Sequence, residues 1–268
     1  MTGHIAFSTP EQSGVRHRSN LPAGDGGAPV FLGMEGCVTD RSAVVRGEVD
    51  IPVAGGRVSG SLSIPAEAQG LVIFAHGSGS SRLSPRNQLV AAILQKSGLA
   101  TLLMDLLTPS EERMDEVTAE LRFDIPFLAR RLAEVTDWAR REPATRELNA
   151  GYFGASTGAA AALMAAAGRE DIGAIVSRGG RPDLAGEALE QVTAPTLLLV
   201  GGKDDEVIRL NRIACERLRG VRKLEIIPGA SHLFAEPGTL ERVAERASEW
   251  FTQSRRTPVG CSLQSGGR

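Results

Sequence analysis

Residues 151–158 read Gly-Tyr-Phe-Gly-Ala-Ser-Thr-Gly, and an alanine-rich run, AAALMAAAG, follows at 160–168. An apolar run ends here and a helix-forming run begins, which predicts a tight strand-to-helix turn around Ser156. The small residues on both sides of Ser156 allow a strand and a helix to pack closely. Two interpretations compete. The hydroxyl is incidental to the turn, or the turn exists to present it for chemistry.

Short apolar runs recur on both sides of this turn, and each has the composition of a parallel strand that is buried on both faces. They are LVIFAHG (71–77), LATLLMDLL (99–107), IGAIVSRGG (172–180), PTLLLVGG (195–202) and KLEIIPG (223–229). Before them, AVVRGEVDIPV and RVSGSLSIP flank Ala-Gly-Gly, which predicts two antiparallel strands. Helical patterns separate the later runs. The sequence therefore predicts an α/β fold with a mostly parallel eight-stranded sheet covered by helices on both faces.

The helical patterns have recognisable ends. Ser84 and Pro85 provide an N-cap residue and a proline at the first helical position, which predicts a helix to about Lys96. Amphipathic stripes predict further helices at 127–138 and 240–251. Only residues 181–194 separate the sixth strand from the seventh, so we expect no large lid domain; MDEVTAELRF, at 114–123, is the other candidate flap and is acidic.

The two ends of the chain differ from its middle. Residues 1–44 lack periodicity and residues 255–268 are rich in Gly, Ser and Arg, so we expect a loosely ordered leader and a flexible tail around one domain at 45–254. Of the 268 residues 42% are hydrophobic and only 4% aromatic, which predicts a large aliphatic core.

Charge and cysteine content exclude several classes of partner. The formal net charge is -2, which gives no reason to expect nucleic acid or an anionic membrane. The three cysteines are odd in number and far apart, which indicates neither a zinc site nor a disulfide framework. No signal peptide or membrane span is visible. We therefore expect a cytoplasmic protein without metal or cofactor, acting on a small molecule, with a homodimer left open.

Polar residues that follow the buried strands are candidates for chemistry, because ligands of such sheets bind beyond the carboxyl ends of the strands. Gly154 to Gly158 form G-x-S-x-G, the nucleophile elbow, after the fifth strand. Asp204 follows the seventh strand and His232 the eighth. The order Ser, Asp, His predicts that Ser156 is a nucleophile, His232 its base and Asp204 the group that orients the histidine.

Each of these residues also has a structural interpretation. A loop histidine is often only solvated, and Asp204 or Asp205 can start a helix. Three matches in one order on the appropriate strands favour the catalytic interpretation. Asp204 is preferred to Asp205 on the family resemblance described below, which implies an apolar residue, here Val207, shortly after the acid.

The glycine-rich turn after the third strand, HGSGSS at 76–81, can aim a backbone N–H at a developing oxyanion. We expect Ser78 to supply this donor and Thr157 the second one. Neither G-x-G-x-x-G nor G-x-x-x-x-G-K-[ST] is present, which argues against a phosphate cradle. His76 and Asp105 are expected to be structural.

Together HGSGSS, GASTG, GGKDDEV and GASHLF resemble the α/β-hydrolases, particularly the dienelactone-hydrolase-like branch, over about residues 46–252. SPRN, LLMDLLTPSEE and SRGGRPDLAG resemble small bacterial hydrolases of this branch, some of them fused to a phosphoribosyltransferase, of which no motif is visible here. Dienelactone hydrolase proper carries a cysteine at the elbow. Ser156 at that position favours a serine esterase. Because no large lid is expected, we also expect an open site that prefers short acyl chains.

Two other functions stay open at this point. A thioesterase or acyltransferase would use the same acyl-enzyme, and α/β-hydrolase folds also occur as non-catalytic binding modules. Arg178, at the end of the sixth strand, is a candidate for binding an anionic end of the substrate through paired hydrogen bonds. The alternative is that it pairs internally with Asp183 or Asp204 and braces the loop.

Overall fold

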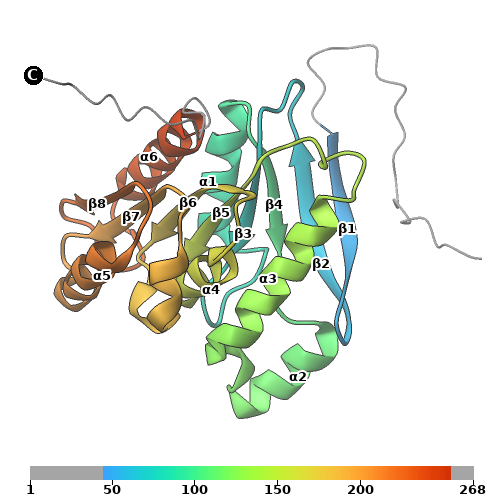
Figure 1. The fold of residues 1–268 in the computed structure, drawn as a ribbon, viewed down its shortest axis with the longest axis horizontal. Helices are drawn as coiled ribbons and strands as arrows, with labels where there is room; N and C mark the ends of the chain where they lie inside the picture. The colour runs from blue at the N-terminus through green and yellow to red at the C-terminus, as the bar shows by residue number, and fades with distance from the viewer. Residues whose placement is uncertain (1–44, 255–268) are drawn as a thin grey trace, which may run out of the picture.

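A computed structural model describes residues 45–254 (Figure 1). The predicted leader and tail, with Cys37 and Cys261, lie outside these residues. The elements in chain order are β1 (Val45–Val53), β2 (Gly56–Ile64), β3 (Leu71–Ala75), α1 (Pro85–Lys96), β4 (Ala100–Met104), α2 (Pro109–Thr118), η1 (Leu121–Phe123), α3 (Ile125–Ala139), β5 (Ala150–Ala155), α4 (Thr157–Ala166), β6 (Ile172–Arg178), η2 (Pro182–Gln191), β7 (Thr196–Gly201), α5 (Asp205–Arg217), β8 (Arg222–Ile227) and α6 (Thr239–Gln253).

The eight strands form one sheet in the order β1-β2-β4-β3-β5-β6-β7-β8. β1 pairs with β2 and β2 with β4 in antiparallel register, and all later pairs are parallel. This confirms the predicted fold class. β5, which leads into Ser156, lies in the middle of the sheet between β3 and β6.

Helices cover both faces of the sheet (Figure 1). One apolar core joins the sheet to α3, α4 and η2, and a second core joins the other face to α1 and α6. Because side chains alternate along a strand, Ile175 of β6 points into the first core, and Ala174 and Val176 point into the second. The sheet is therefore buried on both sides, as the uninterrupted apolar strands predicted.

Helix α4 is enclosed on nearly all sides. Its alanines are buried between β5, α3 and η2, which explains why its sequence is apolar around the whole helix rather than along one stripe. Alanine also lets the helix approach its neighbours closely. The core is aliphatic, as expected, with Tyr152 and Phe153 of β5 among its few aromatic side chains.

The connections between the later strands are short. The link from β6 to β7 contains only the 3-10 segment η2, and the flap predicted at 114–123 is the end of α2 followed by η1. Helix α2 begins with a complete capping box, in which Thr108 and Glu111 bond to each other's backbone amides. Within residues 45–254 no helix is both long and apolar enough to cross a membrane.

Candidate active site

Ser156 occupies a strained turn between β5 and α4, with φ 51° and ψ -120°. Glycine is required on both sides of it. A Cβ at Gly154 would lie 2.4 Å from Ala159 Cα, and one at Gly158 would lie 2.2 Å from the carbonyl oxygen of Ala75. These contacts hold α4 against the ends of β5 and β3. The side chain of Ser156 makes no capping bond with α4, although Ser156 is its N-cap residue.

Asp204 and His232 meet above the ends of β7 and β8. The His232 ring bonds through Nδ1 to Asp204 Oδ2 at 2.6 Å. Asp205 is instead the first residue of α5. With Nδ1 engaged by the carboxylate, Nε2 is the ring nitrogen that is left to exchange a proton with a nucleophile.

The His232 ring lies beside the elbow. Ser156 N–H donates to the carbonyl oxygen of Arg178 at 3.2 Å. A Cβ on the next residue, Gly179, would lie 3.7 Å from His232 Cε1. No hydrogen bond joins Ser156 Oγ to His232 in the part of the chain that is described. Hydrogen bonds between reacting groups are often long in the absence of substrate. Ser156 and His232 therefore lie near each other here without a direct hydrogen bond between them.

The loop that carries His232 is fixed by Glu236, a residue that the sequence did not single out. The backbone N–H and the hydroxyl of Ser231 both donate to Glu236 Oε2, at 2.9 and 3.1 Å. Lys203 lies 3.4 Å from the other carboxylate oxygen. The hydrogen bond from the Ser231 amide is the main reason why the pKa of Glu236 falls to about 2. An acid four residues after a loop histidine has no general signature in sequence.

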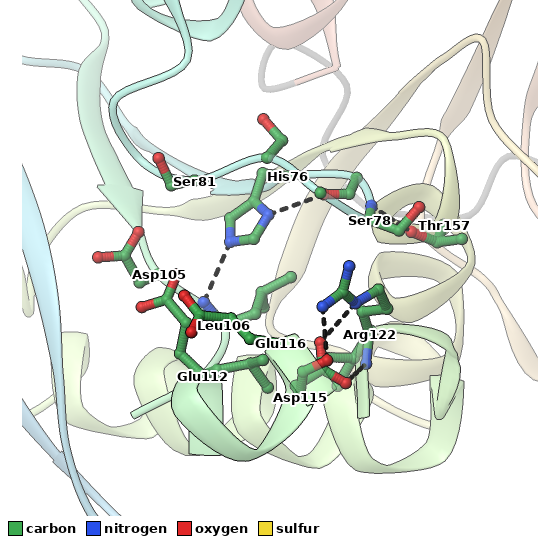
Figure 2. Close-up of a pocket in the computed structure, with 15 residues that line it drawn as sticks. His76, Ser78, Ser81, Asp105, Leu106, Glu112, Asp115, Glu116, Arg122 and Thr157 are labelled. Atoms are coloured by element: carbon green, nitrogen blue, oxygen red, sulfur yellow. Dashed lines mark hydrogen bonds and ion pairs between the residues drawn. The ribbon is translucent and has the colours of Figure 1, made fainter. Parts of the chain in front are cut away.

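The two expected oxyanion donors lie next to each other. The amide of Ser78 donates to Thr157 Oγ1 at 2.9 Å (Figure 2). Thr157 is the first residue of α4, where a backbone N–H has no acceptor within the helix. The Ser78 amide is therefore already engaged by an acceptor within the protein, the Thr157 hydroxyl.

His76 has a structural environment. The amide of Leu106 donates to its Nε2 at 3.2 Å, and its Nδ1 lies 3.0 Å from the carbonyl oxygen of Gly77 (Figure 2). This pattern fixes a neutral ring protonated on Nδ1, and burial lowers the pKa of His76 accordingly. Asp105 accepts hydrogen bonds from the amide and the guanidinium of Arg82. Both residues therefore hold the glycine-rich loop against β4.

A cavity of about 350 Å³ opens beside Ser78 and Thr157 (Figure 2). Its wall consists of the 76–81 loop, residues 105–107 after β4, three acids of α2, Arg122, Leu128 and Thr157. Ser156 and His232 do not line it. The cavity therefore adjoins the candidate oxyanion donors on the side of α2 and α3.

The charges on the cavity wall are unevenly compensated. Asp115 pairs with Arg122 at 2.6 Å, and this contact holds the pKa of Asp115 below its usual range. Glu112 and Glu116 have no ion pair with any described residue. Two carboxylates are thus left without a counter-charge, and the cavity disfavours an anionic group.

Comparisons with solved structures decide the family. The chain is 57% identical to a dienelactone hydrolase from Anabaena variabilis, with a TM-score of 0.77, over 78% of this chain and 98% of that one. This chain belongs to the dienelactone hydrolase family. No family model matches the sequence.

More distant members of the fold have the same architecture. Est1E from Butyrivibrio proteoclasticus is 18% identical with a TM-score of 0.66, over 78% of this chain and 99% of that one. At this identity the similarity shows the α/β-hydrolase fold alone.

The curated relatives carry a different name. Two Mycobacterium tuberculosis proteins, each named "Putative phosphoribosyl transferase", are 54% identical to this chain over 205 residues. The match covers 76% of this chain but only 45% of each relative. The chain therefore spans less than half the length of these proteins.

The close packing at the elbow predicts that one added methyl group lowers the stability of the fold. Gly158→Ala should destabilise the protein by about 1–3 kcal/mol, because the new Cβ would overlap the backbone at the end of β3. Gly173→Ala in β6 is the matched control, since its Cβ would make only ordinary contact, 3.6 Å from the Ala150 oxygen. Chemical denaturation of both variants measures the difference; equal stability would contradict this packing.

The ionised side chain of Glu236 should make the stability of the fold sensitive to acid. Its pKa in the fold lies below its usual value of 4.5, so its charge stabilises the fold at neutral pH, and this contribution is lost as the pH falls from 4.5 toward 2. Glu236→Gln should lower the melting temperature at pH 7 and flatten its decline on acidification. The exposed Glu245→Gln is the control. A pH profile of Glu236→Gln identical to that of wild type would show that the carboxylate does not hold the loop.

Proposed function

We propose that the protein is a serine hydrolase that cleaves small carboxylic esters or lactones through an acyl-enzyme. The observation that carries the proposal is the Asp204–His232 hydrogen bond of 2.6 Å beside a serine held at φ 51°. A carboxylate on Nδ1 orients the ring and stabilises its protonated form. The strained turn is the backbone conformation that a nucleophile elbow requires.

In the proposed reaction Ser156 Oγ attacks the carbonyl carbon of the ester while His232 Nε2 takes the hydroxyl proton. Collapse of the tetrahedral intermediate breaks the bond to the leaving alcohol, which receives that proton. Water then attacks the acyl-enzyme with His232 again as the base. This step releases the carboxylic acid and regenerates the free serine.

The negative oxygen of the intermediate requires hydrogen-bond donors that are already in place. Thr157 N–H, at the positive end of α4, is the first. The Ser78 amide is the second, once its bond to Thr157 Oγ1 is exchanged for one to the substrate. This exchange requires the Thr157 side chain to change its χ1 rotamer, which moves Oγ1 away from the Ser78 amide.

The cavity beside these donors favours a small, uncharged group. Its volume of about 350 Å³ is at the small end of the range for ligand pockets. The unpaired Glu112 and Glu116 disfavour an anion there. Since only the short η2 segment joins β6 to β7, we expect activity on short acyl chains without interfacial activation.

The phosphoribosyl transferase name of the curated relatives is not carried over, because the aligned region is less than half of each relative and has an α/β-hydrolase fold. Acyl transfer and a binding module were the alternatives from sequence. No contact in the described residues favours either over hydrolysis. Turnover of any member of a panel of p-nitrophenyl and thioester substrates would exclude the binding module.

Ser156→Ala should abolish labelling by a fluorophosphonate and lower kcat by about six orders of magnitude, as loss of the nucleophile does in other triad enzymes. Ser97→Ala, at the far end of α1, is the control and should be labelled and active. Normal turnover by Ser156→Ala would refute the proposed mechanism.

Replacing each of the two neighbouring aspartates should have an unequal effect on kcat. Asp204→Asn should reduce kcat by about four orders of magnitude, because an amide no longer favours the correct ring tautomer or stabilises its charge. Asp205→Asn should have a small effect, since Asp205 lies in the first turn of α5. Steady-state kinetics of both variants is the measurement, and a larger loss in Asp205→Asn would reverse the assignment.

A further inference from the structure

Arg178 lies next to the candidate nucleophile but on a different side of it from the cavity. It is the last residue of β6, and its carbonyl oxygen accepts the Ser156 amide. By strand alternation its side chain follows Ala174 and Val176 toward the α1–α6 face. The cavity with its unpaired acids lies on the α2–α3 side.

The guanidinium of Arg178 is buried without a counter-charge. The residue is 8% exposed, and its Nε and Nη1 are buried without any hydrogen-bond partner among residues 45–254. The two acids expected from sequence as its internal partners are engaged elsewhere. Asp183 pairs with Arg181 through two hydrogen bonds of 2.9 and 2.8 Å, and Asp204 bonds to His232.

A second guanidinium increases the local positive charge. Burial, together with the positive charge of Arg86, lowers the pKa of Arg178 to about 10. Arg86 is the second residue of α1, where the helix dipole is positive, and its Nε is also buried without a partner. Two cations and a helix N-terminus thus repel one another. Such an arrangement is costly unless an anion compensates it.

We propose that Arg178 and Arg86 form an anion subsite that binds a phosphate monoester carried by the ester substrate. This inference rests on the proposed hydrolase function for the reaction itself, but the binding of the anion does not depend on turnover. A single carboxylate would neutralise one of the two guanidiniums. A phosphate monoester carries a charge near -2 at neutral pH and offers three acceptor oxygens, which matches two unpaired guanidiniums.

The subsite also orients the substrate. The anionic end is attracted to the Arg178 side of Ser156 and repelled by Glu112 and Glu116 on the cavity side, so the neutral part of the ester enters the cavity. Charge separated in this way across the nucleophile selects one of two possible binding directions.

The test uses inorganic phosphate as the probe. It should competitively inhibit hydrolysis of mono-p-nitrophenyl succinate, whose anionic end would occupy the subsite, and it should do so more strongly than acetate at equal ionic strength. Arg178→Met and Arg86→Met should each weaken phosphate inhibition about tenfold or more, the usual effect of losing charged hydrogen bonds. Arg178→Lys, which keeps the charge but not the planar fork, should fall between wild type and Arg178→Met.

Arg181→Met is the matched control, because Arg181 lies in the same loop and is already paired with Asp183. It should change the inhibition constant by less than about threefold. The melting temperature without phosphate gives a second readout. Arg178→Met should be as stable as wild type or more so, since it removes an uncompensated buried charge. If Arg178 instead braced the loop, Arg178→Met would melt at a lower temperature than wild type.

Calorimetric titration with inorganic phosphate separates this inference from the proposed function. Phosphate binding that is lost in Arg178→Met supports the subsite even if no ester is turned over. Phosphate affinity that is unchanged in both Arg178→Met and Arg86→Met overturns it, whatever the esterase activity. Binding of acetate as tight as that of phosphate overturns the assignment to a phosphate group.

Discussion

The close packing of α4 against the ends of β3 and β5 is the constraint on which the site depends. Neither Gly154 nor Gly158 has room for a methyl group, so the chain passes from strand to helix within a single residue. That residue, Ser156, takes a conformation that is unfavourable for a side chain, and the surrounding packing maintains it. The same contact sets the position of Thr157 at the start of α4, next to the Ser78 loop.

Around this fixed point the charges are divided. Carboxylates without partners face the cavity on the α2–α3 side, and guanidiniums without partners lie on the α1–α6 side. Most other charged groups near the site are paired, including Asp105 with Arg82 and Arg181 with Asp183. Under the proposed function, these exceptions would set which end of a substrate lies on each side of Ser156.

Much of the fold followed from sequence, because buried parallel strands read as uninterrupted apolar runs and the eight predicted strands are all present. The positions of Ser156, Asp204 and His232 at strand ends could be predicted for the same reason. The hydrogen bond between Asp204 and His232 joins loops 28 residues apart, and the family resemblance was what favoured Asp204 over Asp205 in the sequence.

Other features depended on three-dimensional packing. Glu236 acts through a local turn of the His232 loop, and acids at such positions are usually solvated. Among the described residues Arg178 has no charged partner because both acids proposed from sequence, Asp183 and Asp204, bond to other residues. Only the three-dimensional structure shows this. The bond between the Ser78 amide and the Thr157 hydroxyl spans 79 residues and has no pattern in the chain.

The central claim is that Ser156 forms a covalent acyl-enzyme, and trapping that intermediate tests it most directly. The protein would be mixed with p-nitrophenyl acetate, quenched in acid within the first turnover, digested, and analysed by peptide mass spectrometry. The account predicts one acetyl group on the peptide that contains Ser156, formed together with a burst of p-nitrophenol. Turnover with an unmodified Ser156, or an acetyl group on another residue that accounts for the burst, would contradict it.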